Sequence, residues 1–170
     1  MRRMLAVVAL AALGVAWPAD LNACGDKSMS AGGIRNQRAV AARYPASILM
    51  YAQANSRGAT AARELKLSET LPIVGHKYRE VASLSDAEAA VDSGLYNVVM
   101  AEAAELPALQ QRIGTSRSKP VVIPIAYKLT KTQTRDVERQ NRFVVKAPSR
   151  AAEYLTTIAD AVRSKDNAPR

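Results

Sequence analysis

The fold of this chain is decided by residues 75–102, which read GHKYREVASLSDAEAAVDSGLYNVVMAE. Two short runs that suit β-strands, His76–Ala82 and Tyr96–Ala101, flank a segment with helical spacing. A strand, a helix and a second strand in this order are typical of a parallel β-α-β unit. The stretch therefore predicts an α/β fold.

Three further apolar runs extend this pattern along the chain. They are Ala46–Ala52, Val121–Ala126 and Phe143–Lys146, and a segment with helical character follows each one. Five strands that alternate with helices predict a doubly wound parallel sheet, which gathers a binding site at the carboxyl ends of its strands. We therefore expect the functional residues at those ends.

Capping and stop signals predict five helices. Ser85 and Glu88 have the spacing of a capping box, and Ser149 is the expected N-cap of the last helix. Pro72 indicates a kink or an early end in the first helix. The expected ranges are Ala59–Val74, Asp86–Ser93, Leu106–Ile113, Thr130–Asn141 and Ala151–Val162.

The amino-terminal residues have the pattern of a secretory signal. Two arginines precede Leu5–Trp17, an apolar stretch that is too short for a permanent membrane span. Leu21-Asn22-Ala23-Cys24 resembles a bacterial lipobox, in which Cys24 would be lipidated; the alternatives are a free thiol or an ordinary signal-peptidase cut nearby. We expect an exported, periplasmic protein that a lipid tethers to a membrane.

The chain is expected to divide into four parts. Residues 1–23 are the signal peptide, 24–45 a flexible tether, 46–163 a single α/β domain and 164–170 a disordered tail. Within the tether, Ala39–Arg43 could form a short helix before Pro45.

The chain is strongly basic, with a formal net charge of +9 at pH 7. Outside the cytoplasm this charge favours anionic surfaces such as lipid headgroups. No stacking aromatic residues interleave with the lysines and arginines, so we expect no nucleic-acid partner. The alternative is a solvated basic surface without a specific partner.

The order of these segments resembles a response-regulator receiver domain. The resemblance spans residues 46–163 and implies a receiver-like or flavodoxin-like sheet with strand order 2-1-3-4-5. The residues that carry it are Gly75–Ser83, Asp86–Ala90, Tyr96–Glu102, Pro120–Ala126 and Phe143–Pro148. Separately, Cys24-Gly25-Asp26-Lys27 resembles the start of a group of exported bacterial proteins.

The resemblance assigns functional positions that have mostly lost the group used by the family. Ala52 and Gln53 replace the acidic pair that binds Mg²⁺ in receivers, and Glu102 replaces the phospho-accepting aspartate. The family's hydroxyl residue falls near Ile125, and its lysine is kept as Lys146. Because Mg²⁺ and phosphoryl transfer depend on carboxylates held in position, we expect no metal, no cofactor and no enzyme activity. Glu102 and Lys146 could form a fixed ion pair; the alternative is two independently solvated side chains.

The loop after the first strand offers a different kind of site. Backbone N–H groups at a helix start, with Ser56 and Arg57, could hold a phosphate as flavodoxins hold FMN. The alternative is an ordinary capped loop. His76, the only histidine, is expected at the surface and cannot build a metal cluster or a catalytic triad by itself.

The sequence therefore predicts a non-catalytic binding or regulatory module. A protein partner would meet the face formed by the fourth helix, fifth strand and fifth helix, which receivers commonly use for association. The first alternative is a flavodoxin-like or solute-binding module for a small anionic ligand, and a weaker one is catalysis through Glu102. The candidate rim residues are Gln53, Ser56, Arg57, Glu102, Tyr127 and Lys146.

Overall fold

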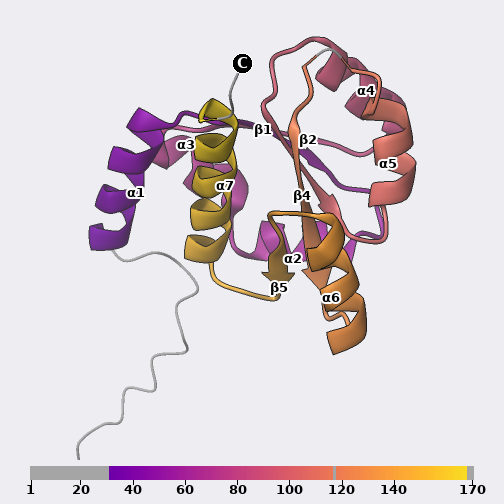
Figure 1. Ribbon diagram of the computed structural model, residues 1–170. Coiled ribbons are helices and arrows are strands. Elements are labelled where there is room, and N and C mark those ends of the chain that lie inside the picture. Colours follow the sequence, from indigo (N-terminus) through magenta and orange to yellow (C-terminus); the bar gives the residue numbers. More distant parts are fainter. Residues whose placement is uncertain (1–30, 117, 168–170) are drawn as a thin grey trace, which may run out of the picture.

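The computed structural model describes residues 31–116 and 118–167 (Figure 1). The expected signal peptide and Cys24 lie outside the described residues. None of the helices in these ranges is both long and apolar enough to cross a bilayer.

Five parallel strands form one sheet in the order β2-β1-β3-β4-β5. This order confirms the doubly wound sheet that the alternation of strands and helices predicts, and it is the flavodoxin-like order that the resemblance implies. Apolar residues of the inner strands are buried on both faces, as the continuous runs in the sequence indicate. The strands are β1 (Ser47–Tyr51), β2 (Lys77–Val81), β3 (Val98–Glu102), β4 (Val121–Tyr127) and β5 (Val145–Ala147).

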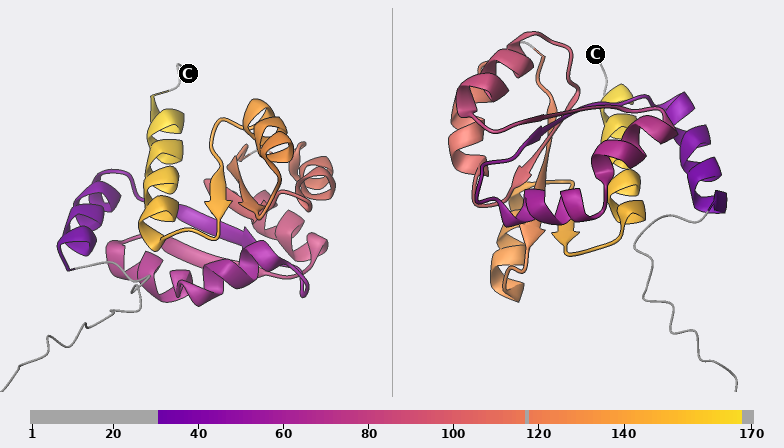
Figure 2. Two further views of the ribbon diagram at one scale, coloured as in Figure 1. Left: turned by 90° about the horizontal axis from the view of Figure 1, so that it is seen from below. Right: turned by 180° about the vertical axis from the view of Figure 1, so that it is seen from behind.

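Helices cover the two faces of the sheet (Figures 1 and 2). Alternate strand residues point to opposite faces, so Met50 and Met100 pack under α2 (Arg57–Glu64), α3 (Leu67–Val74) and α7 (Ala151–Asp166). Leu49 and Val99 pack on the other face under α4 (Leu84–Asp92) and α5 (Leu106–Ile113). The bounds of α5 are those expected from the sequence.

One helix differs from all others in the described part of the chain, because it has no buried residue. This is α6 (Lys131–Gln140), which packs beside β4 and extends past the arrowhead of β5 (Figure 1). Its N-cap, Thr130, forms a capping box with Gln133. Local capping therefore supports a helix that the core does not.

The boundaries of α2, α3 and α4 differ from the expected ones. The predicted helix Ala59–Val74 is two helices, because Lys66 takes a left-handed conformation with φ 52° and interrupts the ladder. Pro72 lies inside α3 without ending it. Ser83, not Ser85, caps α4, since its hydroxyl accepts a hydrogen bond from the Asp86 backbone N–H at 3.1 Å.

The expected tether holds a longer helix than the short one considered at Ala39–Arg43, because residues 31–43 form α1 (Ala31–Arg43). This helix lies beside α3 and α7 (Figure 2). Ala41 is buried there, and Arg38 Nε donates a 2.8 Å hydrogen bond to the Ile73 carbonyl. The ring of Tyr44 lies near the guanidinium groups of Arg43 and Arg163, at 5.7 and 5.3 Å. These contacts attach the segment to the domain.

The expected disordered tail is wrong over residues 164–166, because α7 continues to Asp166. Lys165 Nζ donates to the carbonyls of Ser118 and Lys119, at 3.2 Å each. The N-cap of α7 is Arg150, and the Ser149 hydroxyl expected to cap it is buried without a hydrogen-bond partner.

The expectation of a surface histidine is also wrong. His76 is 4% exposed, and its Nδ1 accepts a 3.1 Å hydrogen bond from the Ala46 backbone N–H. Burial lowers the pKa of this imidazole. The side chain therefore acts as a neutral acceptor that joins the starts of β1 and β2.

Candidate functional site

The candidate site lies where β1 and β3 end side by side, the point at which the strand order reverses. The loop from Gln53 to Ser56 leads from β1 into α2, and Glu102 is the last residue of β3. Both segments lie at the edge toward which the strands point (Figure 1). The fold therefore brings the candidate residues of the Gln53–Ser56 loop and Glu102 to the same edge of the sheet.

The Glu102 carboxylate is bound by the start of α2. Its Oε2 accepts hydrogen bonds from the Ser56 hydroxyl and the Gly58 backbone N–H, both at 2.9 Å. Ser56 is 3% exposed, and its hydroxyl also accepts from the Ala59 N–H at 3.2 Å as the N-cap of α2. A carboxylate of the chain thus occupies the helix start where an external anion would bind.

Gly58 makes this approach possible. A Cβ at this position would lie 3.1 Å from Cγ2 of Ile125 and 3.4 Å from Cβ of Glu102. Even an alanine would require Ile125 or α2 to shift by a few tenths of an ångström. The short distance between Glu102 and α2 therefore depends on a residue without a side chain.

Glu105 is a site residue that the sequence interpretation missed. Burial raises the pKa of its carboxyl, and the nearby Glu102 carboxylate adds to the rise, while the Ser56 hydroxyl and the Gln53 backbone oppose it. Its Oε2 is buried without a hydrogen-bond partner. The only signal in the sequence is a second glutamate three residues after the end of β3.

Of the two alternatives for Glu102 and Lys146, an ion pair or two independently solvated side chains, the ion pair does not form. Lys146 Nζ lies 2.7 Å from Glu138 Oε1, and this contact raises the pKa of the lysine. Val145 and Ala147 face the core under α2 and α7, so Lys146 between them points toward the opposite face. Glu102 turns to α2, and the two side chains diverge.

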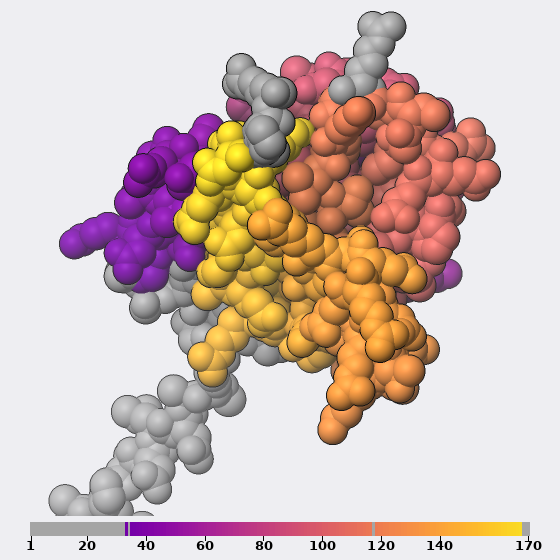
Figure 3. Space-filling view, in the orientation of Figure 1, coloured from indigo at the N-terminus to yellow at the C-terminus, as the bar shows by residue number. Residues whose placement is uncertain are grey.

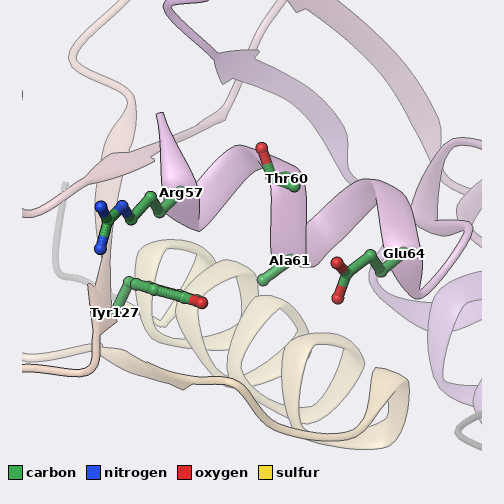
Figure 4. Close-up of a pocket in the computed structure, with 5 residues that line it drawn as sticks. All are labelled: Arg57, Thr60, Ala61, Glu64 and Tyr127. Carbon is green, nitrogen blue, oxygen red and sulfur yellow. The ribbon is translucent and has the colours of Figure 1, made fainter. Parts of the chain in front are cut away.

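A shallow pocket of about 230 Å³ lies beside the site, between α2 and the end of β4 (Figure 4). Arg57 and Tyr127 stand at one end and Glu64 at the other. Lys128 Nζ lies 5.4 Å from the centre of the Tyr127 ring. Of the candidate rim residues, Ser56 is therefore hydrogen-bonded to Glu102, and Arg57 and Tyr127 border the same pocket. Lys146 belongs to neither group.

The Gln53 side chain is directed to Tyr51 and not to the Glu102 carboxylate. Its Nε2 donates a hydrogen bond to the Tyr51 hydroxyl. At the end of β1, the Gln53 amide is therefore hydrogen-bonded to the phenol of the buried Tyr51.

The chemistry available to this arrangement is limited. Among residues 31–116 and 118–167, no group of three or more His, Cys, Asp or Glu side chains could hold a metal ion. Glu102 and Glu105 can accept hydrogen bonds, and a carboxylate at the start of α2 opposes the binding of an external phosphate. Comparison of the chain with protein-family models, curated proteins and solved structures gives no match.

Proposed function

We propose that this chain is a non-catalytic, receiver-like module that works by docking a protein partner. The docking surface is the α6–β5–α7 face, made of residues 131–140, 145–147 and the exposed side of 151–166. The module is exported to the periplasm, with Cys24 as a lipid anchor. The export and the anchor rest on the sequence alone.

The observation that carries the proposal is the engagement of Glu102. A phospho-acceptor must reach both a phosphoryl donor and a metal, but Glu102 Oε2 is bound to Ser56 and Gly58. Lys146, which would steady a phosphoryl group, pairs with Glu138 instead. These contacts support a domain held in one state.

The α6–β5–α7 face has an open strand edge and an unburied helix. β5 pairs with β4 on one side, and no other described strand pairs with its second edge. In the space-filling view, the orange atoms that follow β4 form a projecting lobe beside the yellow α7 (Figure 3). An open strand edge beside an unburied helix favours association with another chain.

Site-specific photo-crosslinking in the native host tests the proposal. A photoreactive residue is placed at Thr132 or Gln140, both exposed on α6, and control residues at Ala89 on α4 and Gln110 on α5. We expect one protein adduct from the α6 positions and none from the controls. Equal labelling from all four positions, or none from α6, would contradict the docking face.

A small anionic ligand is a second candidate, favoured by the pocket at Arg57. This arginine is exposed and makes no ion pair within the described residues, and Tyr127 provides an aromatic wall. The Gly58 N–H and the Ser56 hydroxyl are already used by Glu102, which weighs against an FMN phosphate there. FMN absorbance in purified protein, or a thermal shift with added FMN, would support this candidate. If neither signal is observed, FMN is excluded as the ligand.

Phosphotransfer through Glu102 has a direct test of its own. The protein is incubated with acetyl phosphate and Mg²⁺, and its intact mass is measured. We expect no added phosphoryl group, because the carboxylate is held by two hydrogen bonds and lacks a metal-binding acidic pair. A phosphorylated species that Glu102→Gln abolishes would overturn the proposal of a non-catalytic module.

A further inference from the structure

We infer that the groove between α6 and β5 binds an acidic segment of the partner protein, whose carboxylates contact Lys131, Arg135 and Lys146. This inference rests on the proposed docking function and specifies the chemistry of the partner.

The first observation is a concentration of positive charge. Residues 128–150 hold two acidic residues, Asp136 and Glu138, against seven basic ones. This short segment therefore contributes more than half of the formal net charge of +9. The basic residues are Lys128, Lys131, Arg135, Arg139, Arg142, Lys146 and Arg150.

The second observation is a groove that gathers part of this charge. A pocket of about 320 Å³ is bounded by α6 on one side and Lys146 on the other. Lys131 and Arg135 are four residues apart on α6, so they lie on one face of the helix, and both border the pocket. Neither makes an ion pair within the described residues, which leaves two cations available to a ligand.

Lys146 is paired, but its pair can be exchanged. The Lys146 and Glu138 side chains are 61% and 40% exposed, so water screens their attraction. A carboxylate from another chain could replace Glu138 as the partner of Lys146 at little cost. Glu138 therefore acts as an internal competitor for the groove.

The composition of α6 favours an acidic polypeptide over a membrane or a nucleic acid. Val137 is its only strongly apolar residue, and an interfacial helix needs an apolar face to enter the lipid. The nearest aromatic rings, Tyr127 and Phe143, each lie under a cation, at 5.4 and 5.3 Å from the ring centres. They are poorly placed to stack on bases.

The test uses a fluorescein-labelled decaglutamate peptide and the full-length protein, with fluorescence anisotropy as the readout. We expect Lys131→Glu/Arg135→Glu to weaken binding at least tenfold. The matched control is Lys77→Glu/Arg79→Glu on β2, at the far edge of the sheet, which changes the net charge equally and should alter binding less than twofold. Glu138→Gln should strengthen binding several-fold, because it removes the competitor of the ligand.

Three results would overturn the inference. Equal weakening by both double variants would assign binding to net charge alone. Binding to vesicles of phosphatidylglycerol and phosphatidylcholine, with no binding to decaglutamate, would assign the groove to a lipid surface. A partner crosslinked at Thr132 or Gln140, together with no decaglutamate binding, would leave the docking function standing and refute the acidic chemistry.

Discussion

Replacing Ser56 by alanine tests whether the start of α2 and the end of β3 are bound to each other as the structure indicates. The substitution removes two interactions of one buried hydroxyl. It deletes the N-cap bond from the Ala59 N–H and the bond that the hydroxyl donates to Glu102. The Gly58 N–H remains as a donor to Glu102, so the carboxylate keeps one of its two contacts.

The expected cost is the sum of a cap and a charge-assisted hydrogen bond. Loss of a serine N-cap costs about 1 kcal/mol. A hydrogen bond to a charged group contributes about 1.5–3 kcal/mol when buried, and the partial exposure of Glu102 places this one at the lower end. We therefore expect Ser56→Ala to lower the free energy of unfolding by about 2.5 kcal/mol, or the Tm by about 5–10 °C for a domain of this size.

The matched control is Ser83→Ala in α4. Ser83 also caps a helix and donates to a carboxylate, Asp86 Oδ2 at 2.7 Å, but this carboxylate is exposed and belongs to the same helix. Its removal should cost only the cap, about 1 kcal/mol. Urea unfolding measures both variants, together with Glu102→Gln and the double variant Ser56→Ala/Glu102→Gln.

Either of two outcomes would contradict this link between α2 and β3. The first is a cost for Ser56→Ala no larger than that for Ser83→Ala. The second is a coupling energy between Ser56 and Glu102 below about 0.5 kcal/mol in the double-mutant cycle, since contacting residues normally couple more strongly.

Three further variants test other parts of the structure. Because folding lowers the pKa of His76, the contribution of this residue to stability should be full above about pH 6.5 and should fall at lower pH. His76→Asn keeps an acceptor for the Ala46 N–H and should reduce this loss, which urea unfolding at pH 7 and pH 5 measures. Folding raises the pKa of Glu105, so the stability of the domain should fall as the pH rises through and above about 4.5. Glu105→Gln should remove that fall. An unchanged pH profile in this variant would show that the carboxyl is exposed to water. Gly58→Ala should cost about 1–2 kcal/mol through the contact with Ile125, and should cost less in an Ile125→Ala background; equal cost in both would point to another cause.

The sheet was predictable because its signal is redundant. Each inner strand is a short and mostly apolar run, and the alternation with helices leaves few arrangements for a chain of this length. β3 and β4 lie almost where the runs at Tyr96 and Val121 indicate. Errors of one or two residues at the strand ends do not change the topology.

Helix starts were less predictable, because neighbouring residues offer the same capping chemistry. Ser83 and Ser85 both precede an acidic residue by three positions, and only packing of the helix selects the first. The break at Lys66 has no glycine or proline to announce it. Only the end of α1, Ala39–Arg43, was expected as a short helix, because the attachment of α1 depends on contacts with α3 and α7 that lie far along the chain.

In the candidate site, too, some positions were predictable from the sequence and others were not. Local sequence correctly placed Ser56 and Glu102 at adjacent strand ends, since parallel strands end at one edge. It could not show that Lys146 points to the opposite face, because this depends on which residues of β5 are buried. Glu105 follows β3 in a turn, where no strand or helix period fixes the direction of its side chain.

α6 shows why binding and folding can be separated in this domain. A ten-residue helix is marginal in water without tertiary packing, and no residue of α6 is buried. Its stability therefore depends on local interactions, such as the Thr130 and Gln133 capping box and the bond that the Thr134 hydroxyl donates to the Thr130 carbonyl at 2.9 Å. Lys131 and Arg135 contribute little to the core, so their charges can be changed with little effect on folding. Loss of binding in those variants can then be attributed to the surface itself.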